Sequence, residues 1–274
     1  MTHSPATIAS LLATAGIAPS RALGQNFVAD PNTVRRIARL ADVGPGDRVV
    51  EIGAGLGSLT LALVETGADV TAVELDRHLV PILREQVEPR GVRVVEGDAL
   101  ELDWGEVLGA DPVDPDVPGW VLVANLPYNV ATPLVLDLLD QVPAIERMLV
   151  MVQLEAGQRL AADVGDPAYG IPSVKVSYWA TADVVGRVPP SVFIPRPKVD
   201  SALVRIVRRR APAVEADPER LFVLVRAGFG QRRKMLRRSL AGLVDAAAFE
   251  RAGVRPEARA EELSVHDWGR LAQA

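Results

Sequence analysis

The segment NLPYN (residues 125–129) carries groups that could act chemically on a nucleobase. It directly follows WVLVA (120–124), a short apolar run that is typical of a buried strand. An amide, a proline and a phenol ring therefore stand in a row where a predicted strand ends. Asn and Pro are also common in ordinary turns, so the segment by itself would fit a plain turn at the end of a strand.

The chemistry that suits these groups is activation of an aromatic amine. The exocyclic nitrogen of adenine is a poor nucleophile because its lone pair is delocalised into the ring. The side-chain oxygen of Asn125 and the main-chain carbonyl of Leu126 would accept hydrogen bonds from that nitrogen and draw it toward tetrahedral geometry. Pro127 would fix the backbone between the two acceptors, and Tyr128 would stack on the flat base. We therefore interpret Asn125, Leu126 and Tyr128 as candidates for holding and activating an adenine.

A glycine-rich turn, EIGAGLGSLT (51–60), follows an earlier apolar run and opens a helix-like segment. Glycines at 53, 55 and 57 let the backbone turn tightly and approach a ligand closely. Ser58 stands where the dinucleotide fingerprint G-x-G-x-x-G requires glycine, and no lysine follows in Walker A spacing. With Glu51 directly before it, the pattern E-x-G-x-G-x-G favours an S-adenosylmethionine enzyme over a nicotinamide oxidoreductase or a P-loop protein.

Polar side chains also stand where successive predicted strands end. Glu74 ends the second strand, 74 − 53 = 21 residues after Gly53, and could accept both hydroxyls of a ribose. Asp98 ends the third strand and could accept a hydrogen bond from an adenine amino group. Asn125 ends the fourth. Because the carboxyl ends of parallel strands meet at one edge of a sheet, these residues predict a nucleoside site.

The elements that must position these residues alternate between strand and helix. The expected strands are RVVEIGA (48–54), DVTAVEL (69–75), VRVVEG (92–97), WVLVA (120–124), RMLVMVQ (147–153), VKVSYWA (174–180) and SALVRIV (201–207). Helix-like stretches separate the first five, which predicts parallel βαβ units and a doubly wound sheet. The last two are expected to form an antiparallel pair joined by a long proline-rich loop.

The C-terminal part of the chain has a different character. A polar hinge, RRRAPAVEADPER (208–220), precedes short helices that we expect at 218–229, 232–243, 246–252 and 264–272. We therefore predict a first domain of residues 1–209 and a small helical domain of residues 210–274. The acidic segment 109–119 is expected to be a surface loop without chemistry.

Composition excludes several classes of protein. The 274 residues include no cysteine, so disulfides and thiolate metal sites are ruled out. Three histidines, His3, His78 and His266, lack metal-ligand spacing. The N-terminus does not resemble a signal peptide, and no apolar run reaches 18 residues. We expect a soluble, cytoplasmic protein with no bound metal.

Charge is distributed unevenly along the chain. The net charge is −5, yet residues 201–240 hold eleven Lys and Arg against three acids, a local charge of 11 − 3 = +8. Such asymmetry suggests a polyanionic partner at one end of the molecule, although an isolated basic run is often only a solvated helix face. The segment QRRKMLRRSL (231–240) would contact phosphates.

Together these motifs resemble the ribosomal RNA adenine-N6 dimethyltransferase family, which modifies small-subunit RNA. NLPYN looks like the (N/D)-P-P-(Y/F) motif of amino-N methyltransferases. The motifs that carry the resemblance follow the family's order: LGQNFVAD (23–30), EIGAGLGSLT (51–60), VELDR (73–77), EGDAL (96–100), NLPYNVATPL (125–134), VPPSVFIPRPKVDSALV (188–204) and FGQRRKMLRRSL (229–240).

The resemblance implies an α/β fold: a seven-stranded Rossmann-like methyltransferase domain followed by a small, all-helical domain. It implies S-adenosyl-L-methionine as cofactor, held by Gln25, Asn26, Val28, Gly53, Gly55, Glu74, Asp98, Ala99 and Asn125. It also implies that Phe193 stacks on the second face of the target adenine, and that Arg232, Arg233, Lys234 and Arg237 bind RNA. Val28 is a mild departure, because the family commonly has leucine there.

The activity implied is two methyl transfers onto each of two adjacent adenines near the 3′ end of 16S ribosomal RNA, during ribosome biogenesis. The partner would be 16S RNA within the small subunit or its precursor, and the chain would act as a monomer. One alternative is a macrolide-resistance type enzyme that methylates a large-subunit adenine with the same catalytic core. Another is a non-catalytic ribosome-assembly factor that has kept the fold.

Overall fold

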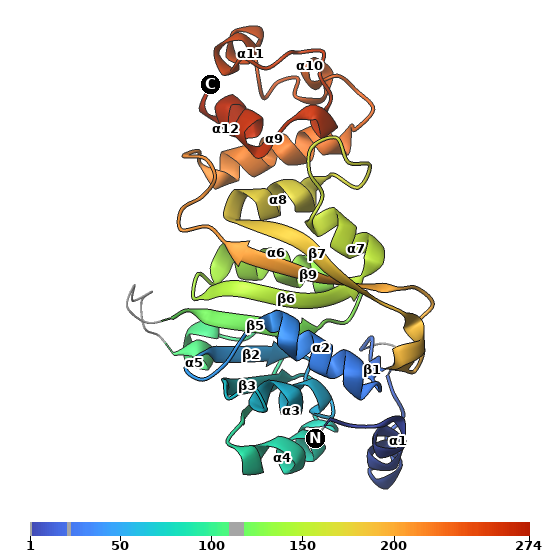
Figure 1. The fold of residues 1–274 in the computed structure, drawn as a ribbon. Coiled ribbons are helices and arrows are strands. Elements are labelled where there is room, and N and C mark those ends of the chain that lie inside the picture. The colour runs from blue at the N-terminus through green and yellow to red at the C-terminus, as the bar shows by residue number, and fades with distance from the viewer. Residues whose placement is uncertain (1, 21–22, 110–117) are drawn as a thin grey trace. The chain divides into compact units, whose positions relative to one another are not determined.

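A seven-stranded sheet forms the centre of the larger of the two parts of the chain (Figure 1). The computed structural model describes residues 2–20, 23–109 and 118–274, so most of the acidic segment 109–119 lies outside the described residues. The strand order is β4-β3-β2-β5-β6-β9-β7, and a second, two-stranded sheet pairs β1 with β8. The predicted seven-stranded α/β architecture is confirmed.

The first five predicted strands form as expected and run parallel. They are β2 (Arg48–Ile52), β3 (Asp69–Glu74), β4 (Arg93–Glu96), β5 (Trp120–Asn125) and β6 (Ile145–Gln153). Parallel pairing joins β2 to β3 and β5, β3 to β4, and β5 to β6. The helices between or before them are α2 (Pro31–Ala41), α3 (Ser58–Val64), α4 (Val80–Val87), α5 (Trp104–Leu108) and α6 (Ala131–Gln141).

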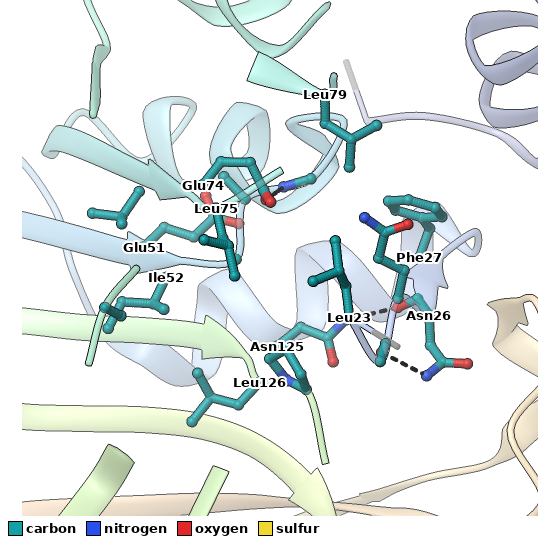
Figure 2. A pocket seen from close by; sticks show the side chains of 18 of the residues that line it. Leu23, Asn26, Phe27, Glu51, Ile52, Glu74, Leu75, Leu79, Asn125 and Leu126 are labelled. Atoms are coloured by element: carbon teal, nitrogen blue, oxygen red, sulfur yellow. Dashed lines mark hydrogen bonds between the residues drawn. The ribbon is translucent and has the colours of Figure 1, made fainter. Parts of the chain in front are cut away.

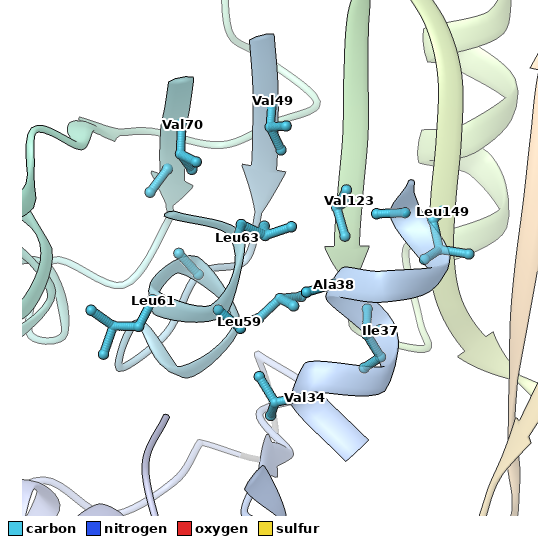
Figure 3. Close-up of a cluster of buried hydrophobic side chains, with 14 of the residues drawn as sticks. Val34, Ile37, Ala38, Val49, Leu59, Leu61, Leu63, Val70, Val123 and Leu149 are labelled. Atoms are coloured by element: carbon cyan, nitrogen blue, oxygen red, sulfur yellow. The ribbon is translucent and has the colours of Figure 1, made fainter. Parts of the chain in front are cut away.

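Both faces of this sheet are covered, which is why its strands are nearly continuous apolar runs. Val49, Val123 and Leu149 pack against α2 and α3 in one cluster (Figure 3). The alternating residues Leu122 and Val150 are completely buried on the opposite side. In Figure 1, α2 and α3 lie in front of the strands and α6 lies behind them.

The sixth predicted strand, VKVSYWA (174–180), is wrong. These residues are mostly in a helix, α8 (Ile171–Trp179), and the strand β7 (Ala180–Val188) begins only after it. Buried residues at 174, 176 and 178 imitate the alternation of a strand, but Pro172 in the first turn is a helix-start signal. β9 (Ser201–Arg208) pairs antiparallel with β6 on one side, and β7 is its hydrogen-bonded neighbour on the other side.

The remaining elements belong to the two ends of the chain. At the N-terminus are α1 (Pro5–Thr14) and β1 (Phe27–Val28), and β8 (Phe193–Ile194) pairs with β1. Toward the C-terminus are α7 (Leu154–Leu160), α9 (Pro218–Gly230), α10 (Leu236–Ser239), α11 (Ala246–Ala252) and α12 (Val265–Gln273). The predicted helix 232–243 is wrong, because only 236–239 are helical and turns flank them.

The chain forms two compact units. One contains Met1–Gly157 and Asp183–Val207, and the other contains Gln158–Ala182 and Arg208–Ala274. The helical unit has its own core, in which Tyr178, Leu221 and Trp268 are buried. The sequence predicted a division between residues 209 and 210. In the structure, residues 158–182 also belong to the unit that contains the C-terminal helices. Among the described residues, no helix is both long and apolar enough to cross a bilayer.

Candidate active site

A pocket opens at the carboxyl ends of β2, β3, β4 and β5 (Figure 2). Most of the predicted site residues line it: Gln25, Asn26, Val28, Gly53, Gly55, Glu74, Asp98, Ala99, Asn125, Leu126 and Tyr128. These residues come from five separate stretches of sequence. The sheet edge brings them together, as open α/β sheets do with ligand-binding residues.

The carboxylate of Glu74 is held in place by main-chain donors. Its Oε2 accepts from the N–H of Gly55 at 2.7 Å, and its Oε1 accepts from the N–H of Asp76 at 2.8 Å. Burial raises the pKa of this carboxyl, and the two N–H donors oppose that effect. The acid is therefore oriented before any ligand arrives, with lone pairs left to accept hydroxyl groups.

The glycine turn adopts the backbone that its sequence predicts. Gly53 and Gly55 have φ angles of 74° and 60°, in the left-handed region that disfavours other residues. α3 begins directly after the turn at Ser58. A Cβ on Gly55 would lie 3.1 Å from the Phe27 ring, so the absence of a side chain also lets residue 27 pack against the turn.

Glu51 is a second carboxyl in the pocket wall, and its role was not foreseen beyond its place before the glycine turn. Only 2% of the residue is exposed, and its Oε2 has no hydrogen-bond partner among the described residues. Burial, together with the nearby Glu74 carboxylate, raises the pKa of Glu51 to about 8. The side chain is therefore protonated at neutral pH in the absence of a ligand.

The side-chain amide of Asn125 has a defined orientation. Its Nδ2 donates to the main-chain carbonyl of Asn26 at 2.9 Å, which Figure 2 marks with a dashed line. Asn26 in turn donates from its own Nδ2 to the carbonyl of Gly24 at 3.0 Å. Since the amide nitrogen of Asn125 is engaged, its Oδ1 is the atom left to accept from a ligand.

Tyr128 is half-buried beside this amide, and its phenol has one protein partner. The Tyr128 hydroxyl lies 2.7 Å from Oγ of Ser201, a completely buried residue at the start of β9. Burial raises the pKa of the Tyr128 phenol, so it stays neutral at physiological pH. The ring is therefore tethered at its hydroxyl end.

Phe193 does not line the pocket. It is 4% exposed and packs in the same core cluster as α2 and α3. β1–β8 pairing places it opposite Val28. Stacking on a base would require the ring to leave that core, and this role of Phe193 stays a prediction.

The four basic residues proposed for RNA all lie in the helical unit, on an exposed turn before α10 and within α10. Arg232 contacts Glu261 at 2.6 Å and donates to the carbonyl of Pro167 at 3.2 Å. Arg237 lies 3.5 Å from Glu257. Arg233 and Lys234 make no ion pair with any residue that the structure describes.

Sequence reasoning missed the apolar walls of the pocket. Leu75 and Leu100 both line it, and they are unusually exposed for leucines, at 48% and 47%. Leu75 directly follows Glu74, and Leu100 follows Asp98 by two residues. Their position beside strand-end carboxylates was the available signal, because flat bases need apolar faces as well as polar edges. Within the described ranges, no cluster of three or more His, Cys, Asp or Glu could hold a metal.

The fold is that of an α/β protein with a pocket at the carboxyl ends of its parallel strands, and comparison with known proteins narrows the class of protein. The family model "Ribosomal RNA adenine dimethylase" matches residues 19–274. "Ribosomal RNA small subunit methyltransferase A" of Kineococcus radiotolerans is 48% identical over 266 residues, covering 93% of this chain and 86% of the relative. The protein of that name from Thermobifida fusca is 47% identical and covers 98% and 94%.

Solved structures agree with this. The 23S rRNA methyltransferase ErmE is 29% identical with a TM-score of 0.70, covering 90% of this chain and 98% of that one. A dimethyladenosine transferase from Plasmodium falciparum, 24% identical with a TM-score of 0.72 and covering 88% and 94%, shares the fold. The chain belongs to the ribosomal RNA adenine dimethylase family, and it is therefore a ribosomal RNA methyltransferase.

Proposed function

We propose that this enzyme transfers methyl groups from S-adenosylmethionine to N6 of two adjacent adenines near the 3′ end of small-subunit ribosomal RNA. The product is N6,N6-dimethyladenosine, formed during ribosome biogenesis. The observation that carries the proposal is the orientation of Asn125. Its amide nitrogen donates a hydrogen bond to the main-chain carbonyl of Asn26, so its side-chain oxygen remains available to accept a hydrogen bond from the target amine.

The pocket fits the proposed cofactor. Glu74 is oriented by two N–H donors to receive ribose hydroxyls, and Asp98 with Ala99 would receive the adenine edge. Leu75 and Leu100 offer apolar faces to that ring. Oε2 of Glu51 is buried and has no hydrogen-bond partner among the described residues, so it would be available for a hydrogen bond with the cofactor. When bound, the cofactor supplies the methyl group.

The chain's own residues then act on the target base. Tyr128 would stack on one face of the adenine, while Asn125 Oδ1 and the Leu126 carbonyl would accept from the N6 hydrogens. These hydrogen bonds would free the nitrogen lone pair to bond to the methyl carbon, with the sulfur of the cofactor as the leaving group. The methylated nitrogen is acidic and loses its proton to water, so a dedicated base is not needed.

The specificity for the small subunit is supported by the names of relatives that are 45–48% identical to this chain. A large-subunit substrate is the competing assignment, because ErmE has the same fold at 29% identity. The experiment that separates them is methyl transfer from labelled S-adenosylmethionine to ribosomal subunits that lack these modifications, followed by nucleoside analysis. Dimethyladenosine near the 3′ end of the small-subunit RNA is expected. Label confined to large-subunit RNA would overturn the proposal, as would cofactor binding without any transfer.

A further inference from the structure

Residues 24–28 contact three parts of the chain around the pocket: the segment after β3, the glycine turn and the loop after β5. On one side they contact elements proposed to hold the cofactor. On the other they contact the loop proposed to hold the target adenine. These two sets of contacts lie within five consecutive residues.

The contacts toward the cofactor side involve Gln25 and Phe27. Gln25 Nε2 donates to Asp76 Oδ2 at 2.8 Å. Asp76 lies two residues after Glu74, the last residue of β3. The Phe27 ring lies against the glycine turn, where a Cβ on Gly55 would be 3.1 Å from it. The segment is thus seated on both the ribose-binding strand end and the glycine turn.

The contacts toward the target side involve Gly24 and Asn26. The Asn26 carbonyl accepts from Asn125 Nδ2 at 2.9 Å and so decides which atom of that amide faces the substrate. A Cβ on Gly24 would lie 3.0 Å from Cβ of Pro127 and 3.1 Å from Oδ1 of Asn129. Gly24 has a φ angle of 63°, and the Asn26 side chain braces it by donating to its carbonyl.

We propose that Gly24 and Asn26 are positioning residues for methyl transfer. The segment that contacts the glycine turn and Asp76 also holds the Asn125 amide in its productive orientation, so the acceptor geometry is complete only when the segment is in place. Without these contacts the Asn125 amide could rotate and present its N–H₂ group to the target amine. An N–H₂ group cannot accept a hydrogen bond from that amine. This inference rests on the proposed function, because it assigns Asn125 Oδ1 to the target nitrogen.

The test compares two glycine substitutions with the same backbone strain. Gly24→Ala introduces a methyl group against Pro127 at a φ of 63°. Gly16→Ala introduces one at a φ of 64°, at the end of α1, with nothing within 4 Å. The difference between the variants isolates the contact with the target loop.

Single-turnover methyl transfer at saturating cofactor, and the affinity for S-adenosylhomocysteine, are measured in both variants and in the unaltered protein. We expect Gly24→Ala to slow transfer about tenfold or more while changing cofactor affinity less than about threefold, since small misplacements cost rate rather than binding. Gly16→Ala should match the unaltered protein in both. An unchanged rate in Gly24→Ala overturns the inference, as does equal loss of rate and cofactor affinity.

A second readout does not depend on turnover. The Asn125 side-chain N–H₂ resonances of ¹⁵N-labelled protein report its bond to Asn26. They should shift in Gly24→Ala and stay in place in Gly16→Ala. Unmoved resonances in Gly24→Ala overturn the inference even where transfer is slowed. If the unaltered protein methylates no small-subunit RNA, the proposed function fails, and these resonances still decide whether the segment orients the amide.

Discussion

The phenol oxygen of Tyr128 lies 2.7 Å from the hydroxyl of Ser201, joining the loop after β5 to the first residue of β9. Ser201 is completely buried, and it lies opposite Gln153 in the β6–β9 ladder, so its hydroxyl is fixed by the sheet. Because the hydroxyl of Tyr128 is hydrogen-bonded to Ser201, the orientation of its ring is fixed before a base stacks on it. The ordering of this side chain is thus completed during folding, before RNA binds.

Because the two hydroxyls depend on each other, Tyr128→Phe and Ser201→Ala should not have additive effects. Each should lower kcat/KM severalfold, and the double variant should be little worse than the single ones. We expect a coupling energy of about 1 kcal/mol from the double-mutant cycle, typical of one hydrogen bond. The measurement is kcat/KM for RNA in all four proteins. Additive losses would show that the bond does not orient the ring.

Tyr128→Ala removes the ring itself and tests stacking. We expect a loss of roughly 1–3 kcal/mol in RNA-dependent kcat/KM, which is the usual contribution of a base stacked on an aromatic ring. Tyr128→Phe is the matched control because it keeps the ring. Full activity in Tyr128→Ala would remove Tyr128 from the base-binding residues.

Asn125→Asp should be nearly inactive while still folded. A carboxylate has no N–H to donate to the Asn26 carbonyl, so the anchor becomes a repulsion between oxygens. We expect kcat to fall about a hundredfold or more, as when one preorganised polar contact in an active site is lost. The same change at exposed Asn32 in α2, Asn32→Asp, controls for the added charge. An Asn125→Asp enzyme with normal kcat would show that the hydrogen bond from the Asn125 amide to the Asn26 carbonyl is not needed for transfer.

Glu51 should make the stability of the folded protein fall as pH rises. In the unfolded chain this carboxyl loses its proton near 4.5, whereas in the fold its pKa is about 8. Between these values the folded state binds more protons than the unfolded state, so the free energy of unfolding decreases with pH, by up to about 4–5 kcal/mol from this group. Its full contribution is present below pH 4.5 and is lost as pH passes 8.

The check is the thermal midpoint of unfolding from pH 5 to pH 9 in the unaltered protein and in Glu51→Gln. The neutral amide is close in shape to a protonated carboxyl, so the variant should have a flatter profile and be the more stable protein at high pH. Parallel profiles would mean that Glu51 is ionised in the fold. Burial also raises the pKa of Glu74, which is present in both proteins, so the difference between the two profiles reports the removal of the Glu51 carboxyl.

RNA binding should depend unequally on the four basic residues of the helical unit. Arg232 and Arg237 are partly neutralised by Glu261 and Glu257, while Arg233 and Lys234 are exposed without an ion pair among the described residues. We expect the double variant Arg233→Ala/Lys234→Ala to reduce the slope of log K against log salt by about 2, or roughly one unit per lost phosphate contact.

Arg232→Ala/Arg237→Ala is the matched variant, since it removes the same charge. Its salt slope should change less. The measurement is RNA affinity over a range of salt concentrations for both double variants. Equal changes in slope would show that the ion pairs to Glu257 and Glu261 open when RNA binds. No change in either would exclude this segment from the RNA interface.

Much of this protein is determined by local sequence. Val-rich runs separated by helix-like stretches predicted the parallel strands, because strands buried on both faces need apolar residues at nearly every position. Gly53, Glu74, Asp98 and Asn125 were recognised because parallel strands end at one edge, so their sequence positions predict a shared pocket. Those inferences need only the pattern of apolar residues along the chain and the fact that strands joined by helices run parallel.

The tertiary structure decided what depends on contacts between distant segments. Residues 174–179 alternate like a strand, yet they belong to α8, where the helical unit buries Val174 and Tyr178 on one side of the helix. The direction of the Asn125 amide depends on a carbonyl 99 residues earlier in the chain. The protonation of Glu51 depends on burial that its neighbours in sequence do not specify. Sequence indicates which groups are available, but orientation and pKa arise from the surroundings that the fold assembles around them.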